Sequence, residues 1–358
     1  MTSAARGGVT VRVPAKINLE LIIGPRRADG YHGLSTVFHA VGLYDDVTVV
    51  PAPRWGATVS GPYAALVPAG GDNLAVRAAR LLAERAGSER AADDDADTHA
   101  LERDETERDQ RANGGCAVRS VPTAESRPVP DPRPGPVHIH IAKEIPVAAG
   151  MAGGSADAAA TLVACDALWR LGSDRELLDE LAATLGSDIN FALTGGTAIG
   201  SGRGERVAPV LGRGRYHWVL AVSETGLSTP AVFAECDRLR EERGETDIPD
   251  PEPSPAMMAA LRSGDPRALG SALRNDLQEA ALSLRPELAE VLEAGLEYGA
   301  LGGIVSGSGP TLAFLVDGPE GALDLAVALT ASGVASDVKR AIGPAHGAHV
   351  LPAATAVR

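Results

Sequence analysis

Residues 146–160, PVAAGMAGGSADAAA, combine the residue types of an anion-binding loop with those of a helix. The glycines lack a Cβ atom, so the backbone there can approach a ligand closely and adopt positive φ angles. The alanines that follow favour a helix, which we expect over about 155–171 with Ser155 as its capping residue. Because the N–H groups and the dipole of a helix N-terminus attract anions, this segment predicts a phosphate-binding loop.

This loop does not fit two common nucleotide-binding patterns. The chain contains no Gly-Lys pair, which the P-loop motif requires. The spacing Gly150-Met151-Ala152-Gly153-Gly154 also differs from the dinucleotide fingerprint, and no suitable acidic residue follows it. A loop that only packs a helix against a strand remains the alternative, although so many flexible residues are costly for packing alone.

Lysine is rare in this chain, and each lysine therefore stands out. Of the 33 basic residues only Lys16, Lys143 and Lys339 are lysine, a compact point charge that suits a phosphate or a reacting hydroxyl. Lys16 lies in an apolar segment, where an unpaired ammonium group is expensive to bury, so it needs a carboxylate or phosphate partner. Lys143 precedes the glycine-rich loop, and we expect it to be a surface charge. Asp188 precedes Ile-Asn-Phe and is, on the residues alone, either a helix N-cap or a proton acceptor.

The pattern along the chain predicts strands and helices without a regular βα repeat. The first half has strands over 11–23 and 137–142, one or two strands within 37–50, helices over 72–87 and from about 174, and a short helical turn and a strand within 186–205. The second half has a strand over 215–223, a helix over 228–239 with Thr229 as N-cap, two or three helices within 254–300, a glycine loop and strand over 302–316, a helix over 319–332 and a last strand over 333–341. A chain of 358 residues with this pattern predicts a mixed α+β protein of two domains.

Residues 88–136 differ in composition from the rest of the chain. They are dense in charge and proline and poor in large apolar side chains, so they cannot bury enough surface to offset the entropy lost on ordering. We expect a disordered acidic and proline-rich insertion. An acidic metal or partner site is the alternative, although the segment lacks the glycine placement of a calcium loop. His138 and His140, just beyond it, are expected to be surface histidines because no third metal ligand lies nearby.

Composition and charge argue against several classes of protein. The formal net charge of −14 is unfavourable for binding nucleic acid and for attachment to a membrane surface. No apolar run reaches the length of a membrane span, and the N-terminal residues lack the apolar region of a secretory signal. Cys116, Cys165 and Cys236 show neither metal-ligand spacing nor an even disulfide set, which indicates a reducing cytoplasm. We infer no obligate protein partner.

The glycine-rich loop and five further motifs, taken in order, resemble those of the GHMP kinases, the family of galactokinase, homoserine kinase and mevalonate kinase. Pro146 to Ala159 resembles the family's phosphate loop, P-x3-G-x2-G-G-S-[AS]-[DN]-A-A. The others resemble motifs of the branch that acts on a cytidyl diphosphate derivative of methylerythritol. They are Pro14-Ala15-Lys16-Ile17-Asn18-Leu19, Arg27-Ala28-Asp29-Gly30-Tyr31-His32, Asp72-Asn73-Leu74, Gly186-Ser187-Asp188 and Ser306-Gly307-Ser308-Gly309-Pro310. The ordered set covers nearly all of residues 11–343, and the segment 88–136 lies outside the pattern.

The resemblance implies an α+β fold of two domains with the active site in the cleft between them. The N-terminal domain, residues 1–212, would resemble domain 2 of ribosomal protein S5. The C-terminal domain, residues 213–345, would be ferredoxin-like, and residues 346–358 would form a flexible tail. The implied reaction is ATP-dependent phosphorylation of the 2-hydroxyl of the cytidyl diphosphate compound, a step of non-mevalonate isoprenoid synthesis. ATP and Mg²⁺ would be the cofactors, and this small molecule would be the partner.

The resemblance also implies a role for individual residues. Lys16 and Asp188 would be catalytic, with Asp188 accepting the hydroxyl proton and Lys16 orienting Asp188 and stabilising the developing charge. The substrate would contact Asn18, Tyr31, His32 and Thr229, and Tyr31 and His32 would hold the cytosine. ATP would contact Pro146, Ala149, Gly150, Met151, Ala152, Gly153, Gly154, Ser155, Ala156, Asn73 and Leu74. The Mg²⁺ ligands stay unknown, with Ser155 as a candidate, and the 306–310 loop would support the phosphate loop.

Other interpretations remain open on the residues alone. Tyr31 and His32 fit an ordinary hairpin turn equally well, and Asn73 fits a helix cap. Another GHMP kinase, of the homoserine or mevalonate type, is an alternative that the Tyr31-His32 pair argues against, because those substrates have no base. A nucleotide-binding regulator without turnover is a further alternative, which the presence of both Lys16 and Asp188 argues against.

Overall fold

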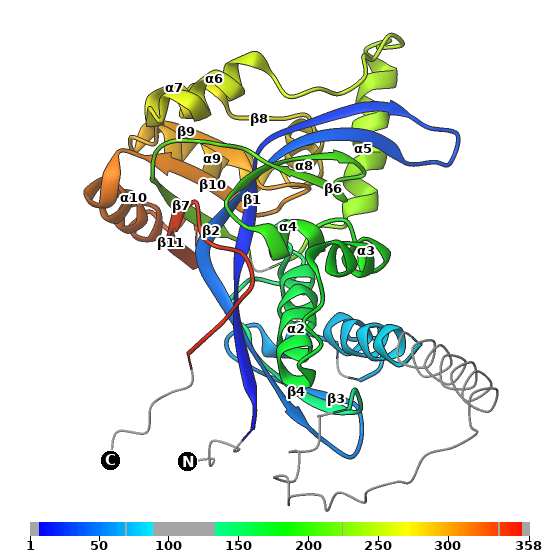
Figure 1. The fold of residues 1–358 in the computed structure, drawn as a ribbon. Coiled ribbons are helices and arrows are strands. Elements are labelled where there is room, and N and C mark those ends of the chain that lie inside the picture. Colours follow the sequence, from blue (N-terminus) through cyan, green and yellow to red (C-terminus); the bar gives the residue numbers. More distant parts are fainter. Residues whose placement is uncertain (1–6, 69, 89–132, 224, 336, 353–358) are drawn as a thin grey trace, which may run out of the picture.

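The computed structural model describes residues 7–68, 70–88, 133–223, 225–335 and 337–352 (Figure 1). Almost all of the expected insertion at 88–136, Cys116 included, lies outside the described residues. No helix in the described ranges is long and apolar enough to cross a membrane. The described chain forms two sheets, one of eight strands and one of four.

Two long antiparallel strands, β1 (Val9–Arg26) and β2 (His32–Pro51), form the frame of the first sheet. The strand predicted over 11–23 is confirmed and is longer than predicted, and residues 37–50, for which one or two strands were predicted, lie in a single long strand. Ala15, Ile17 and Leu19 on one face of β1 lie in the hydrophobic core, whereas the opposite face faces the C-terminal half, where Glu20 accepts a hydrogen bond from Ser254 N. The other strands are β3 (Gly56–Ser60), β4 (Val137–Ala142), β5 (Thr197–Gly202), β6 (Arg206–Pro209), β8 (Arg274–Asn275) and β12 (His349–Val350).

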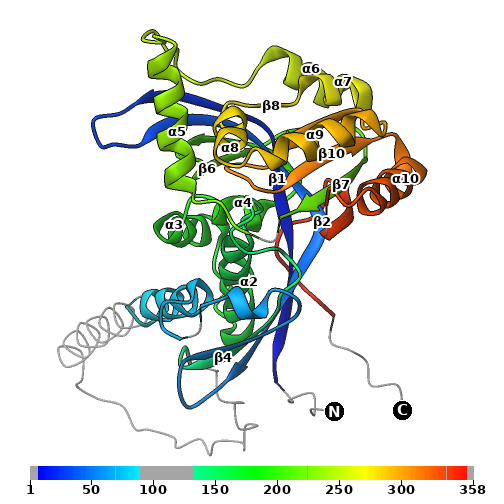
Figure 2. The same ribbon diagram turned by 180° about the vertical axis from the view of Figure 1, so that it is seen from behind.

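Helix α2 (Gly153–Trp169) packs against β1 and β2 (Figure 2). Its buried face is built from alanines, whose small side chains let the helix lie close to the sheet. The helix begins at Gly153, with Ala152 at the N-cap position and no side-chain cap. Ser155 therefore lies inside the first turn, and the expectation that it caps the helix is wrong. The first half also contains the predicted helix, now over residues 74–88, with η1 (Ala64–Leu66), α3 (Arg175–Leu185) and α4 (Ile189–Thr194).

The second sheet has the strand order β11 (Asp337–Gly343), β7 (Tyr216–Val222), β10 (Leu312–Val316) and β9 (Gly302–Val305), with every neighbouring pair antiparallel. In chain order this is fourth, first, third, second, which is the arrangement of a ferredoxin-like unit. The helices of this half are α5 (Thr229–Glu242), α6 (Pro255–Ser263), α7 (Pro266–Ala272), α8 (Gln278–Leu284), α9 (Glu287–Glu297) and α10 (Gly318–Ala331). Four helices occupy 254–300, where two or three were predicted.

Alternate residues of β7 belong to two different hydrophobic cores. Trp218 and Leu220 pack into the core of the first sheet, whereas Val219 and Ala221 pack into the core formed with the C-terminal helices. Successive side chains of a strand point to opposite faces, so the second sheet has apolar contacts on both sides. The two halves are therefore joined by continuous apolar packing.

The expectation for the start of α5 and the expectation for the C-terminal segment are both wrong. Ser228, not Thr229, occupies the N-cap position of α5, and the Thr229 hydroxyl is 2.8 Å from Ser308 Oγ instead. The flexible tail expected from residue 346 is not observed over 346–352, because β12 pairs with β1 and His346 forms a bridge with Gly195. Backbone hydrogen bonds to the first sheet hold this segment, and composition alone does not reveal such pairing. Residues 353–358 lie outside the described range.

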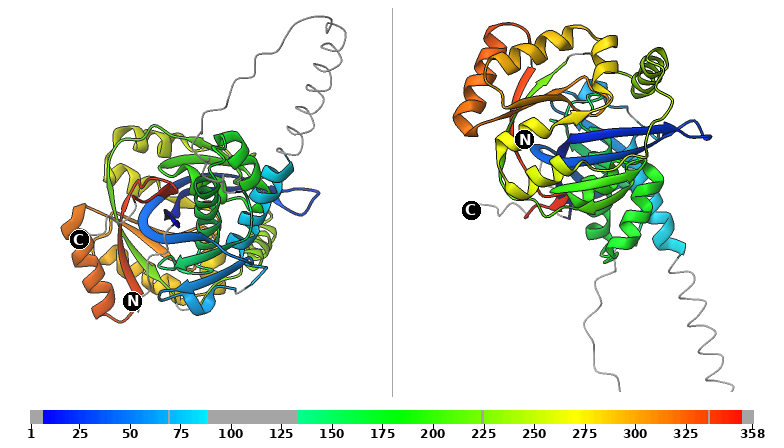
Figure 3. Two further views of the ribbon diagram at one scale, coloured as in Figure 1. Left: turned by 60° about the horizontal axis from the view of Figure 1, so that its bottom comes forward. Right: turned by 90° about the horizontal axis from the view of Figure 1, so that it is seen from above.

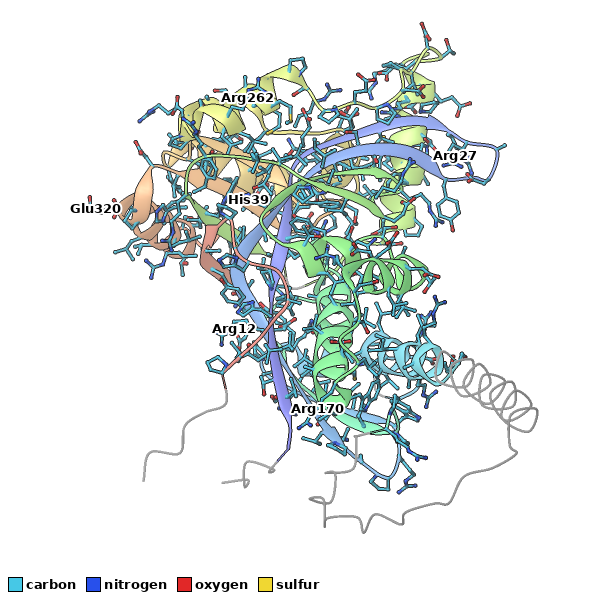
Figure 4. All side chains as sticks on the ribbon, viewed as in Figure 1. Arg12, Arg27, His39, Arg170, Arg262 and Glu320 are labelled. Atoms are coloured by element: carbon cyan, nitrogen blue, oxygen red, sulfur yellow. The ribbon has the colours of Figure 1, made fainter. Side chains whose placement is uncertain are left out.

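His39 is buried where the two sheets meet (Figure 4). Its Nδ1 atom lies 2.8 Å from Thr197 Oγ1, and its ring centroid lies 5.8 Å and 5.9 Å from the rings of Tyr216 and Trp218. Burial lowers the pKa of His39 from 6.5 to about 3, because no carboxylate compensates the loss of hydration. The imidazole is therefore neutral in the folded protein over the physiological range.

Acidification is expected to weaken the fold through His39. Between its unfolded pKa of 6.5 and its folded pKa of about 3, only the unfolded chain binds the proton, so stability falls as the pH falls. From pH 7 to pH 5, the wild type should lose about 2 kcal/mol more than a His39→Gln variant. Urea unfolding at both pH values measures this difference, with His140→Gln on the exposed side of β4 as the control. Equal losses in wild type and His39→Gln would contradict the prediction.

Candidate active site

The glycine-rich segment forms a tight loop between β4 and α2. Ala148, Gly150 and Ala152 have positive φ angles of 53°, 75° and 58°, so the backbone turns sharply just before the helix. The first turn of α2 has N–H groups without partners in the helix, and these groups attract an anion. A Cβ atom at Gly154 would meet nothing within 4 Å, so open space lies in front of this turn. The geometry fits a phosphate group better than a packing loop.

A second glycine-rich loop, residues 306–310, holds the phosphate loop from the C-terminal half. Ser306 Oγ donates a hydrogen bond to Gly150 O at 3.0 Å. A Cβ atom built on Gly150 would lie 1.9 Å from Ser306 O, so the two backbones approach too closely for any side chain. The expectation that 306–310 supports the phosphate loop is confirmed.

Gly150→Ala is expected to cost at least about 2 kcal/mol of folding free energy, because it combines a left-handed backbone with a clash against Ser306. Gly154→Ala is the matched control in the same loop-and-helix segment. It lies in a helix with open space around it, so its stability should equal or slightly exceed that of the wild type. Chemical denaturation of the two variants measures both effects. Similar stabilities for the two variants would contradict the close contact between the loops.

Lys143 is buried beneath the phosphate loop, so the expectation of a surface charge is wrong. Its side chain is 1% exposed, and Nζ donates to Asp45 Oδ2 at 2.6 Å, Asp157 Oδ2 at 2.7 Å and Gly153 O at 2.9 Å. Asp45 also accepts hydrogen bonds from the backbone N–H groups of the two residues after Lys143. Burial raises the pKa of the Asp157 carboxyl, although the Lys143 charge opposes the shift. One ammonium group therefore joins β4, β2 and the first turn of α2 around the loop.

Lys16 and Asp188 lie together beside the two glycine loops. Lys16 Nζ is 3.7 Å from Asp188 Oδ2, and the Lys16 side chain is buried. Asp188 occupies the N-cap position of α4, but its side chain makes no capping hydrogen bond. The carboxylate is thus available to Lys16, which has the acidic partner that its burial requires.

Asn18 orients the Lys16 ammonium group from the same face of β1. Lys16 Nζ donates to Asn18 Oδ1 at 2.7 Å, and Asn18 Nδ2 donates to Thr36 Oγ1 at 2.7 Å. Thr36 Oγ1 donates in turn to the Glu20 carbonyl oxygen, which fixes the direction of every hydrogen bond in the series. A Cβ atom on Gly307 would lie 3.2 Å from Lys16 Nζ, so the 306–310 loop also lies directly against Lys16. Lys16, Asn18 and Asp188 therefore meet next to the phosphate loop.

Tyr31 and His32 lie in different surroundings at the tip of the β1–β2 hairpin. The Tyr31 side chain is 58% exposed, and its ring lies under the Arg203 guanidinium at 5.3 Å. His32 is 7% exposed, and its Nε2 atom is 2.8 Å from Asp237 Oδ1. The two rings are neighbours in sequence, but only His32 is held by hydrogen bonding.

Both the oxygen and the nitrogen of the Asn73 side-chain amide form hydrogen bonds. Its Oδ1 accepts from Ala75 N at 2.9 Å and its Nδ2 donates to Pro68 O at 3.0 Å, so its side chain caps the helix over 74–88. Leu74, half-buried, packs at the edge of the hydrophobic core. Four of the residues predicted to contact ATP are instead buried and support the loop backbone: Pro146, Ala149, Met151 and Ala156.

Comparison with known proteins shows which family the chain belongs to. Models of the GHMP kinases N terminal domain and the GHMP kinases C terminal domain match residues 117–198 and 257–335. A 4-diphosphocytidyl-2-C-methyl-D-erythritol kinase of Thermobifida fusca (strain YX) is 51% identical over 96% of this chain and 98% of its own length. The chain belongs to the 4-diphosphocytidyl-2-C-methyl-D-erythritol kinase family of GHMP kinases.

Solved structures support the same family. The crystal structure of a 4-(cytidine 5'-diphospho)-2C-methyl-D-erythritol kinase matches with a TM-score of 0.67 and 32% identity, over 94% of this chain and 100% of that chain. Homoserine kinase from Cytophaga hutchinsonii matches with a TM-score of 0.61 but 15% identity, over 98% of this chain and 99% of its own, which shows the fold alone. The implied two-domain α+β kinase fold is confirmed.

Several residues that shape the site of this 4-diphosphocytidyl-2-C-methyl-D-erythritol kinase family member were not predicted from the sequence. Asn275 Nδ2 donates to Val305 O and Gly307 O at 2.8 Å each, which fixes the loop that contacts Gly150. Asp45 and Asp157 are buried around Lys143. The rarity of lysine was a signal for these two carboxylates, because a lysine beside the glycine-rich loop of an arginine-rich chain suggests a specific partner.

The donor groups near the loop fit a Mg²⁺ ion that is held mainly by ATP. The described residues contain no group of three or more His, Cys, Asp or Glu side chains placed to bind a metal. Mg²⁺ at such sites needs only one or two protein ligands, because phosphates and water complete its octahedral shell. Ser155, half-buried in the first turn of α2, forms no hydrogen bond through its hydroxyl with any described residue. That oxygen is uncommitted and suits the role.

Proposed function

We propose that this chain transfers the γ-phosphoryl group of ATP to the 2-hydroxyl of 4-diphosphocytidyl-2-C-methyl-D-erythritol, in the non-mevalonate route to isoprenoid precursors. The observation that carries the proposal is the Lys16–Asp188 pair, 3.7 Å apart beside the phosphate loop. It occurs in a chain 51% identical to a kinase named for this substrate.

The phosphates of ATP bind the backbone N–H groups at residues 150–155. Hydrogen-bond donors aimed by a rigid loop stabilise the negative charge that spreads over the phosphate oxygens during transfer. The loop is rigid because Ser306 holds it from one side and Lys143 from the other. Lys16 adds a positive charge at the transferring group, and Asn73 and Leu74 lie on the adenine side.

Asp188 accepts the proton of the substrate hydroxyl. The hydroxyl oxygen forms a bond to the γ-phosphorus as the bond from that phosphorus to the bridging oxygen of ADP breaks. A carboxylate within reach of the hydroxyl takes up the proton as charge develops on the oxygen. Lys16 holds Asp188 in position, because the opposite charges of the two side chains attract each other 3.7 Å apart in a partly buried site. Mg²⁺, with Ser155 as a ligand, supplies charge neutralisation on the phosphates when bound.

The other end of the substrate lies toward the β1–β2 hairpin. Asn18 hydrogen-bonds the substrate near the reacting hydroxyl, and Tyr31 and His32 hold the cytosine. Thr229, whose hydroxyl is 2.8 Å from Ser308, contributes a further polar contact from the C-terminal half. The reaction requires only small molecules as partners. It fits the cytoplasm, where ATP is available and where the free thiols of Cys165 and Cys236 stay reduced.

The test measures ADP release with Mg-ATP and three acceptors in parallel: the cytidyl diphosphate compound, mevalonate and homoserine. Release with the cytidyl compound alone is the expected result. Release with mevalonate or homoserine would keep the kinase chemistry but remove the cytosine role of Tyr31 and His32. ATP binding without ADP release in every mixture would overturn the proposal in favour of a nucleotide-binding regulator.

A further inference from the structure

The tip of the β1–β2 hairpin lies beside α5, and two residues of that helix hold His32 (Figures 1 and 3). His32 Nε2 is 2.8 Å from Asp237 Oδ1. The His32 ring also stacks on Phe233, with centroids 5.3 Å apart and planes 28° from parallel. Phe233 and Asp237 are four residues apart, so they lie on the same face of α5. One residue restrains the plane of the imidazole and the other restrains its direction within that plane.

The contact with Asp237 also decides which nitrogen of His32 carries the proton. An ionised carboxylate only accepts hydrogen bonds, so His32 Nε2 must donate and must carry hydrogen. In the neutral ring, Nδ1 then has a free lone pair and acts as an acceptor. Among the described residues Nδ1 has no hydrogen-bond partner, and it is not one of the enclosed polar atoms. Nδ1 is therefore the atom that His32 can offer to a ligand.

We propose that Asp237 is a positioning residue that makes the site select cytosine over uracil. The inference rests on the proposed function, in which His32 meets the base. Cytosine carries an amino group at C4, which donates a hydrogen bond, whereas uracil carries a carbonyl oxygen there, which only accepts. A fixed acceptor at His32 Nδ1 matches the amino group and repels the carbonyl. Without Asp237, the ring can turn or carry its proton on Nδ1, and that form suits uracil.

The experiment compares the cytidyl acceptor with its uridyl analogue, in which uracil replaces cytosine. Asp237→Ala and Asp237→Leu remove the hydrogen-bond acceptor, and Leu keeps the branched shape of the Asp side chain but is larger. Asp237→Asn keeps an oxygen that can accept from Nε2, and Glu241→Ala removes an exposed carboxylate of the same helix as the control. The ratio of kcat/KM for the two acceptors is measured for each full-length variant, together with Tm.

In the Ala and Leu variants we expect the cytidyl-to-uridyl ratio to fall about tenfold or more. The loss should appear as a raised KM for the cytidyl acceptor, with kcat changed less than about threefold, because Asp237 touches no reacting atom. Asp237→Asn should restore most of the ratio, and Glu241→Ala should match the wild type. Competitive inhibition by CDP and by UDP should show the same loss of selectivity without turnover.

An unchanged ratio in a folded Ala or Leu variant would overturn the role of Asp237, whether kcat/KM stays the same for both acceptors or falls equally for both. If the Ala variant does not fold, the Leu variant, which keeps the branched shape, and the isosteric Asn variant decide the matter between them. Failure of the proposed function is distinguishable, because the wild type would then show no turnover with the cytidyl acceptor at all.

Discussion

Asp188→Asn is expected to lower kcat by a factor of about 10² to 10⁴, the usual contribution of a positioned general base. The amide has nearly the shape of the carboxylate but cannot take up the hydroxyl proton. ATP binding should be nearly unchanged, because the phosphate loop is held by Ser306 and Lys143 and not by Asp188. Single-turnover rates with saturating Mg-ATP and acceptor measure the chemical step directly.

Asp179→Asn is the matched control for this variant. Asp179 is the same residue type but lies in α3, where its side chain is 39% exposed and pairs with Arg175 at 2.8 Å. Its substitution should leave kcat within about twofold, since exposed ion pairs contribute little. If Asp188→Asn kept more than a third of the wild-type kcat, Asp188 would not be the base and its pairing with Lys16 would be structural.

Lys143→Met is expected to destabilise the protein by about 3–5 kcal/mol, because it leaves two carboxylates buried without their counter-charge. It also leaves Gly153 O without its donor at the start of α2. Burial already raises the pKa of Asp157, so in the folded variant this carboxyl should take up a proton at a higher pH than it does in the unfolded chain. The folded state then binds a proton that the unfolded chain does not, so the loss should be smaller at pH 5 than at pH 8. Urea unfolding at both pH values tests this.

Lys339→Met provides the control for removal of a lysine. Lys339 is partly exposed, pairs with Asp337 at 3.3 Å and lies over the Tyr63 ring at 5.4 Å. Its loss should cost no more than about 1 kcal/mol, the usual value of a partly exposed pair. Equal losses for the two lysine variants would show that burial of the Lys143 cluster does not govern the stability of the phosphate loop.

Local sequence pattern was enough to predict most of the elements around the site. The strands β1, β4 and β7 and the helix α2 lie where branched residues, alternation and alanine predicted them. These features depend on neighbours within a few residues, which is the range that a pattern can read. The glycine-rich loop and the order of the motifs were likewise sufficient to predict the kinase fold and the family.

Hydrogen bonds between distant segments overturned several local expectations. Lys143 looked like a surface charge because its partners Asp45 and Asp157 lie 98 and 14 residues away in sequence. Thr229 looked like an N-cap, but Ser308, 79 residues further along the chain, binds its hydroxyl. The segment after residue 345 looked like a tail, but its backbone completes the first sheet. In each case the residue's neighbours in sequence carried no information about its partner in space.

Residue types and their order along the chain were sufficient to predict the family, the glycine-rich loop before α2 and the side chains that can do chemistry. Which of those side chains meet depends on how distant elements pack. Lys16 and Asp188 are 172 residues apart in the chain, and they come within 3.7 Å because β1 and α4 pack on the same core. Asp237 contacts His32 only because α5 packs against the tip of the β1–β2 hairpin. Residue type sets what a side chain can do, whereas burial and packing of distant elements set what it faces.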